Sequence, residues 1–158
     1  AKDAGFMTEG QSFTNASADD VPYERMETIL LEAFPGQAHL VIPLKKEGRI
    51  FELRSYESPT ENLHVKKMDM FNTGGEIPLF NRLGFNPIFY GKVIAGGKMP
   101  NFMYMPIFDN LEQRTEQWKT FGNDPVWKDI STRPENENKV SVSHIDSIVM
   151  QAAEYSDI

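Results

Sequence analysis

The stretch IFELRSY, Ile50–Tyr56, decides the fold, because it is the first strand of a regular series of elements. Side chains of a strand point alternately to two faces, so this stretch has one mostly apolar face and one polar face. The apolar face carries Phe51, Leu53 and Ser55, and the polar face carries Glu52, Arg54 and Tyr56. The polar row is either a network that fixes the sheet or the lining of a ligand site.

The residues after this strand alternate between helical and extended patterns. Helical stretches are predicted to begin at Pro59, at an acidic cap on Asp109 and at Asp124. Further strands are predicted over residues 86–96, 101–109 and 139–150. The resulting order, β-α-β-β-α-β, is the split pattern of ferredoxin-like folds, so the predicted class is α+β.

Two breaks are expected inside these elements. Gly74 and Gly75, followed by Pro78, must kink or split the first helix, because proline removes a donor and clashes one turn back. Pro106 lies within the third predicted strand, where it cannot donate to a neighbouring strand. That strand is therefore expected to lie at an edge or to contain a bulge.

The N-terminal part of the chain resembles its C-terminal end. NASADDVPYERMETILLEAF, with a strand predicted over residues 22–34, parallels RPENENKVSVSHIDSIVMQAAEY in its polar loop, strand and Ala-aromatic ending. Duplication explains the match economically. Residues 1–35 are then the C-terminal remnant of a preceding similar domain, residues 36–48 are a linker, and residues 49–158 are a complete domain. A lone last strand has unpaired edges, so it must dock on this domain or on another chain.

Composition excludes several kinds of site. Hydrophobic residues make up 40% and charged residues 25% of the 158 residues, which is ordinary for a globular domain. The net charge of −7 and the scarcity of clustered Lys and Arg argue against nucleic acid as a partner. The absence of cysteine excludes disulfides and thiolate sites. No apolar run approaches the roughly 20 residues of a membrane span, so we expect a soluble chain, cytoplasmic or exported.

Several motifs together give the domain a family resemblance. FELRSY, EIPLF, NRLG, YGKV, FDNLEQR and NDPVW follow one another between Arg49 and Met150 in an order that resembles the NIPSNAP family. The layout of a tail followed by a full domain is similar to the C-terminal part of tandem members. The resemblance implies that two such units pair as a dimeric α/β barrel.

The barrel geometry implies where the opening strand points. Helices cover one face of the sheet in this architecture, and the other face packs against a partner sheet. Phe51 and Leu53 are then expected to meet the helices, while Glu52, Arg54 and Tyr56 face the enclosed cleft. Because buried charges are paired, Arg54 is expected to bridge Glu52 or another carboxylate. A homodimer or higher homo-oligomer through the sheet face is predicted.

Polar residues on other strands are candidate companions of the row. The predicted ligand site in the cleft comprises Glu52, Arg54, Tyr56, Tyr90, Lys92, Tyr104, His144 and Asp146. Residues two apart on a strand lie about 7 Å apart, so a direct contact between His144 and Asp146 is not expected. No two histidines share a ligand spacing such as H-x-H, so neither a metal nor a cofactor is predicted. A haem-binding variant would use His144 as its axial ligand.

The sequence is compatible with two classes of function. The first is a module that acts through protein association, small-ligand binding in the cleft, or both. The alternative is a cofactor-independent enzyme, similar to the oxygenases and isomerases of related barrels, that acts on a small organic substrate. Many NIPSNAP proteins carry a histidine where this chain has Tyr104. An unperturbed tyrosine titrates at about pH 10, which argues against acid–base chemistry at this position.

Overall fold

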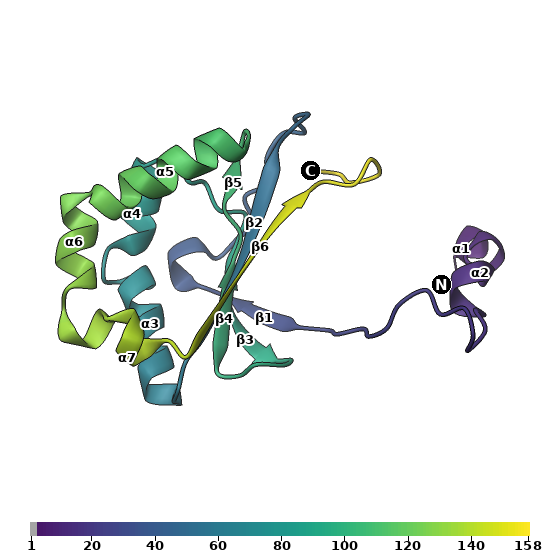
Figure 1. The fold of residues 1–158 in the computed structure, drawn as a ribbon, viewed down its shortest axis with the longest axis horizontal. Coiled ribbons are helices and arrows are strands. Elements are labelled where there is room, and N and C mark those ends of the chain that lie inside the picture. The colour runs from purple at the N-terminus through teal and green to yellow at the C-terminus, as the bar shows by residue number, and fades with distance from the viewer. Residues whose placement is uncertain (1–2) are drawn as a thin grey trace.

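The protein is a single antiparallel sheet with helices packed on one face (Figure 1). The computed structural model describes residues 3–158, without the side chain of Glu135. The strands are β1 (Leu30–Ala33), β2 (Ile50–Glu57), β3 (Tyr90–Ala95), β4 (Asn101–Tyr104), β5 (Ile107–Phe108) and β6 (His144–Gln151). The helices are α1 (Ala4–Glu9), α2 (Gln11–Thr14), α3 (Glu61–Asn72), α4 (Glu76–Arg82), α5 (Leu111–Asn123), α6 (Pro125–Ser131) and α7 (Asn138–Ser141), with short 3-10 turns at Pro35–Gln37 and Pro134–Asn136.

The strand order confirms the predicted topology. The sheet runs β1-β3-β4-β2, and β6 pairs with β2, all antiparallel. Without β1 the order is β3-β4-β2-β6, which is the arrangement of a ferredoxin-like unit. Pro106 separates β4 from β5, but both strands pair with β2 in one continuous register, with Arg54 opposite Tyr104 and Phe51 opposite Ile107. Because β4 also lies between β3 and β2, the expected edge position or bulge at Pro106 was wrong.

The first helical stretch is split in two, as predicted, and glycine explains the split. Gly75 has a φ of 103°, a left-handed value that side chains other than glycine rarely adopt, and it immediately precedes α4. Pro78 lies in the first turn of α4, where backbone N–H groups lack helical partners, so its missing donor costs little there. The chain thus leaves α3, turns at Gly75 and starts a second helix over the same sheet.

Three predicted boundaries were wrong. The strand predicted over residues 22–34 is regular only over β1. Leu30, the first residue of β1, already pairs with Ala95, the last residue of β3, so the ladder between the two strands ends there. The last strand begins at His144 rather than Lys139, because residues 138–141 form α7. The cap of α5 is Asn110 rather than Asp109, and its side chain accepts from Gln113 N at 2.8 Å.

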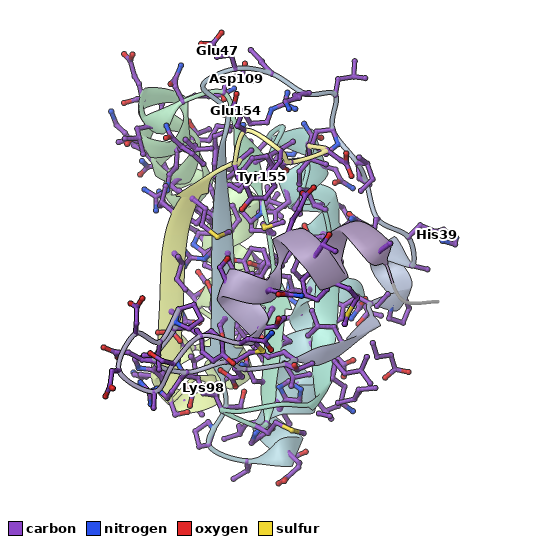
Figure 2. All side chains as sticks on the ribbon, turned by 90° about the vertical axis from the view of Figure 1, so that its right-hand side faces the viewer. His39, Glu47, Lys98, Asp109, Glu154 and Tyr155 are labelled. Carbon is purple, nitrogen blue, oxygen red and sulfur yellow. The ribbon has the colours of Figure 1, made fainter. Side chains whose placement is uncertain are left out.

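The core lies between the sheet and the helices and is strongly aromatic. Phe71 on α3 and Phe80 on α4 are fully buried, and their rings contact those of Phe102 and Tyr104 on β4. The opposite face of the sheet carries no helix in the described part of the chain, and Figure 2 looks onto it. We call it the open sheet face. The short helices α1 and α2 lie apart from the sheet, at the end of an extended segment (Figure 1).

None of the described helices is long and apolar enough to cross a membrane.

Candidate functional site

The polar row of β2 faces the helices, which corrects the predicted orientation. The ring of Tyr56 lies 6.5 Å from that of Phe71 on α3, and Glu52 is hydrogen-bonded to side chains of α5. Leu53 and Ser55 lie on the open sheet face instead, where they line a small pocket with Met103. Alternation correctly separates the two faces, but it does not say which of them the helices will cover. The row is covered because α5 supplies partners that satisfy its charges.

Glu52 is the centre of this network and has no exposed surface. Its Oε1 accepts from Arg54 Nη1 at 2.6 Å, which confirms the predicted bridge, and from Ser147 Oγ at 2.6 Å. Arg114 donates to both carboxylate oxygens from α5, with Nε at 2.7 Å and Nη2 at 2.9 Å. Trp118 Nε1 donates to Oε2 at 2.8 Å. One carboxylate therefore joins β2, β6 and α5.

The surroundings of Glu52 keep it ionised. Burial by itself raises the pKa of this carboxyl, but the hydrogen bonds from Arg114, Ser147 and Trp118 outweigh it and lower the pKa to about 2. Two guanidinium groups contact the one carboxylate, so the cluster carries excess positive charge. A buried carboxylate with this many donors is bound firmly to its partners, and it is not available to react with a ligand.

The other end of the row opens into a cavity. Tyr56 Oη accepts from Arg54 Nε at 3.2 Å and Nη2 at 2.9 Å, and it lies 3.2 Å from Tyr104 Oη. Next to these groups is a cavity of about 190 Å³ between the sheet and the helices. We call it the helix–sheet cavity, and it is lined by Arg54, Tyr56, Lys67, Glu76, Tyr104, Trp118, Phe121, Trp127, Asn138 and Ile145.

Two buried charged residues of this cavity were missed by the sequence analysis. Lys67 on α3 is only 2% exposed, and its Nζ donates to Asn138 Oδ1 at 2.9 Å and contacts Met70 Sδ at 3.3 Å. Glu76 at the start of α4 is 3% exposed, and its Oε2 has no hydrogen-bond partner. Lys67 interrupts the apolar stripe of α3 four residues before Phe71, and that charge inside a stripe was the available signal.

The sequence model of the NIPSNAP family matches residues 51–157, which is more than half of the chain. This chain belongs to the NIPSNAP family. A search of curated proteins found no match. The matched region contains both the row on β2 and every residue that lines the helix–sheet cavity.

Solved structures of NIPSNAP proteins have the same fold. An uncharacterized NIPSNAP-like domain protein from Burkholderia xenovorans superposes with a TM-score of 0.61 at 16% identity, covering 70% of this chain and 90% of that one. A NIPSNAP family protein of unknown function from Agrobacterium tumefaciens gives a TM-score of 0.59 at 17% identity, covering 73% of this chain and 97% of that one. At these identities the likeness concerns the fold alone.

Two more predicted residues share the helix-facing side of this NIPSNAP sheet without lining the cavity. Tyr90 pairs in register with Tyr104, and Lys92 pairs with Phe102. The hydroxyl of Tyr90 is buried and has no hydrogen-bond partner, and burial raises the pKa of this residue. The structure therefore brings Tyr90 close to the row, but it places neither Tyr90 nor Lys92 against the cavity.

His144 and Asp146 lie on the other face of the NIPSNAP sheet, apart from the row. His144 Nε2 contacts Asp146 Oδ1 directly at 3.0 Å, so the prediction that they would not touch was wrong. Exposed side chains can lean along a strand. Asp146 also forms an ion pair with Lys98, which lies in the turn between β3 and β4. Glu57 completes a group whose ligand atoms lie within 4.8 Å of one another, a clustering that sequence spacing did not reveal.

Glu76 should make the stability of this NIPSNAP domain depend on pH. Burial raises the pKa of its carboxyl to about 7, above its value in the unfolded chain. The folded state therefore favours the protonated acid, and the free energy of unfolding should fall as pH rises from about 4.5 toward 7. We expect Glu76→Gln to remove about 1–2 kcal/mol of this fall. Urea unfolding between pH 5 and pH 8 measures it.

The matched control for Glu76→Gln is Glu154→Gln, because Glu154 is exposed near the C-terminus. That variant should keep the wild-type pH dependence. Parallel pH profiles for wild type and Glu76→Gln would show that Glu76 titrates normally in the folded protein.

Proposed function

We propose that this NIPSNAP domain binds a small organic molecule in the helix–sheet cavity. The observation that supports the proposal is the buried Glu76 carboxyl, whose Oε2 has no partner within a cavity that Lys67 also lines. Buried polar groups are nearly always hydrogen-bonded, so an unpartnered one calls for an explanation. A ligand that reaches Glu76 supplies it. The cavity is suitable in size, since an engineered cavity of about 150 Å³ accepts benzene.

The polar row serves two purposes in this proposal. Glu52 holds β2 to α5 and is saturated by protein groups. Tyr104 and Arg54 continue the same network to the wall of the helix–sheet cavity. The structural network and the ligand site are thus two ends of one row, and the first positions the second.

We also propose that the domain associates with a second copy through the open sheet face. Ile148 is 52% exposed and lies next to Leu53 and Met103. The helices α3 to α7 pack on the other side of the sheet, and α1 and α2 lie apart from it (Figure 1). Apolar sheet faces are seldom left to water. Residues 1–35 belong, in this proposal, to a preceding similar unit, and the antiparallel pairing of β1 with the β3 edge is what such a remnant strand is expected to do.

One observation favours an enzyme as the alternative function. A buried carboxyl with a raised pKa beside a cavity is suited to proton transfer, and Glu76 is such a group. The substrate would be a small organic molecule with an exchangeable proton. This alternative uses the same cavity, so ligand binding is the first step to test.

Native mass spectrometry of the gently purified protein tests both parts of the proposal. We expect an added mass that is lost on denaturation, together with a dimer. Ile145→Trp should abolish the added mass, because Ile145 lines the cavity and a larger side chain fills it. Val149→Trp, at a 43% exposed position further along β6 and outside the cavity lining, should retain it. A protein of bare monomer mass that also binds no compound from a library of small organic molecules would overturn the proposal.

A further inference from the structure

We infer that the ligand of the helix–sheet cavity is a small monocarboxylate with a single ring or a short branched chain. This inference rests on the proposed function and adds the chemical class of the ligand. The inference follows from the hydrogen-bonding groups that line the cavity. Several of their donors have no acceptor in the protein. Only a ligand that presents acceptors can satisfy them.

The first free donor is the hydroxyl of Tyr104. Tyr56 Oη accepts two hydrogen bonds from Arg54, at 3.2 Å and 2.9 Å, so the proton of Tyr56 is left to point toward Tyr104. A hydroxyl has one proton and two lone pairs. Tyr104 therefore accepts from Tyr56 and keeps its own proton for another acceptor. Both tyrosines line the cavity, so that acceptor can come from a ligand.

The second free donor is Lys67. Its ammonium group has three protons, and the structure provides Asn138 Oδ1 and the weak acceptor Met70 Sδ as partners. One proton is left for the cavity. Burial lowers the pKa of Lys67, so an anion beside it would strengthen its charged form. A carboxylate in contact with Lys67 would therefore replace an unfavourable burial by a favourable pairing.

The third donor is Glu76 in its protonated form. The groups that face it are Lys67 from α3, Arg54 from β2, Tyr104 from β4 and Tyr90 from β3. Burial keeps its carboxyl neutral to higher pH than usual, so at neutral pH and below it can donate an O–H to a ligand oxygen. The nearby carboxylate of Glu52 should not repel a carboxylate ligand. Arg54 and Arg114 already pair with it and neutralise its charge.

The rest of the cavity selects the body of the ligand. Trp118, Phe121 and Trp127 supply aromatic walls, with Phe121 and Trp127 only 4.3 Å apart between ring centroids. Aromatic walls favour a flat apolar body that stacks against them. The volume of about 190 Å³ limits that body to one ring or a chain of similar size. Benzoate combines both features and serves as the probe.

Titration of the full chain with benzoate and with benzamide, followed by tryptophan fluorescence and calorimetry, tests the inference. Benzamide has the same shape without the charge. We expect benzoate to bind at least about tenfold more tightly, the size of one charge-assisted hydrogen bond. Lys67→Met and Tyr104→Phe should each weaken benzoate by about tenfold. Lys66→Met, an exposed neighbour on α3, should leave its affinity unchanged.

Proton linkage provides a second readout. Benzoate should bind more weakly as pH rises past about 7, because an ionised Glu76 repels it, and Glu76→Gln should bind with little pH dependence. If benzamide binds as tightly as benzoate and Lys67→Met changes nothing, the inferred class is wrong while the proposed function stands. If neither probe binds, no co-purified ligand is found and no compound of the library binds, both fail.

Discussion

Glu52→Gln is expected to lower the free energy of unfolding by about 3–5 kcal/mol at pH 7. The substitution keeps the shape of the side chain but removes the charge that Arg54 and Arg114 share. Two guanidinium groups, 16% and 26% exposed, are then left without a counter-charge between β2 and α5. Because the pKa of Glu52 is about 2, the difference should persist above pH 4.5 and shrink as the pH falls toward 2. Chemical denaturation measures it.

The control is Glu47→Gln, an exposed carboxylate in the turn before β2, which should change stability by less than about 0.5 kcal/mol. A Glu52→Gln variant as stable as this control would show that the row on β2 is solvated.

Phe71→Ala is expected to cost about 3–5 kcal/mol, which makes it the second large effect. Phe71 has no exposed surface, and its ring lies 5.0 Å from that of Phe102 and 5.4 Å from that of Tyr104. Its loss leaves a cavity between α3 and the sheet. Val65→Ala, on the same helix but 47% exposed, should cost under about 1 kcal/mol. Similar melting temperatures for the two variants would contradict the placement of the core.

The order of elements could be predicted because each signal is local. Thr60 caps α3 and Asp124 caps α6, and both are recognisable from the residues that follow them. Gly75 and Pro106 interrupt elements through their own backbone chemistry. Such signals need no knowledge of the tertiary structure, and they were sufficient for the ferredoxin-like topology.

The orientation of β2 could not be predicted, because it depends on residues far away in the sequence. A row of Glu, Arg and Tyr looks like a surface or a cleft lining until Arg114 and Trp118 are known to face it. Those partners follow Glu52 by about sixty residues, and only the fold brings them together. Burial of the row is favourable because α5 satisfies the carboxylate, and that requirement is tertiary.

Only part of the candidate site could be predicted, because the pairing of strands also depends on the tertiary structure. Arg54, Tyr56 and Tyr104 do line the helix–sheet cavity, since they lie on neighbouring strands at matched register. His144 and Asp146 lie on the open sheet face. The pairing of β6 with β2 sets them opposite Glu57 and Ser55, which point away from the helices. Strand periodicity groups residues on one strand, but pairing register between strands decides which groups share a face.

A double-mutant cycle between Glu52 on β2 and Arg114 on α5, using Glu52→Gln and Arg114→Met, tests whether the polar row is buried against the helices. In that position one end of the row is structural, and the other end lines the helix–sheet cavity. We expect a coupling energy of about 1–3 kcal/mol, because the two side chains share two hydrogen bonds. Losses of stability that add to within about 0.5 kcal/mol would place the row away from α5 and show that the helices do not bury it.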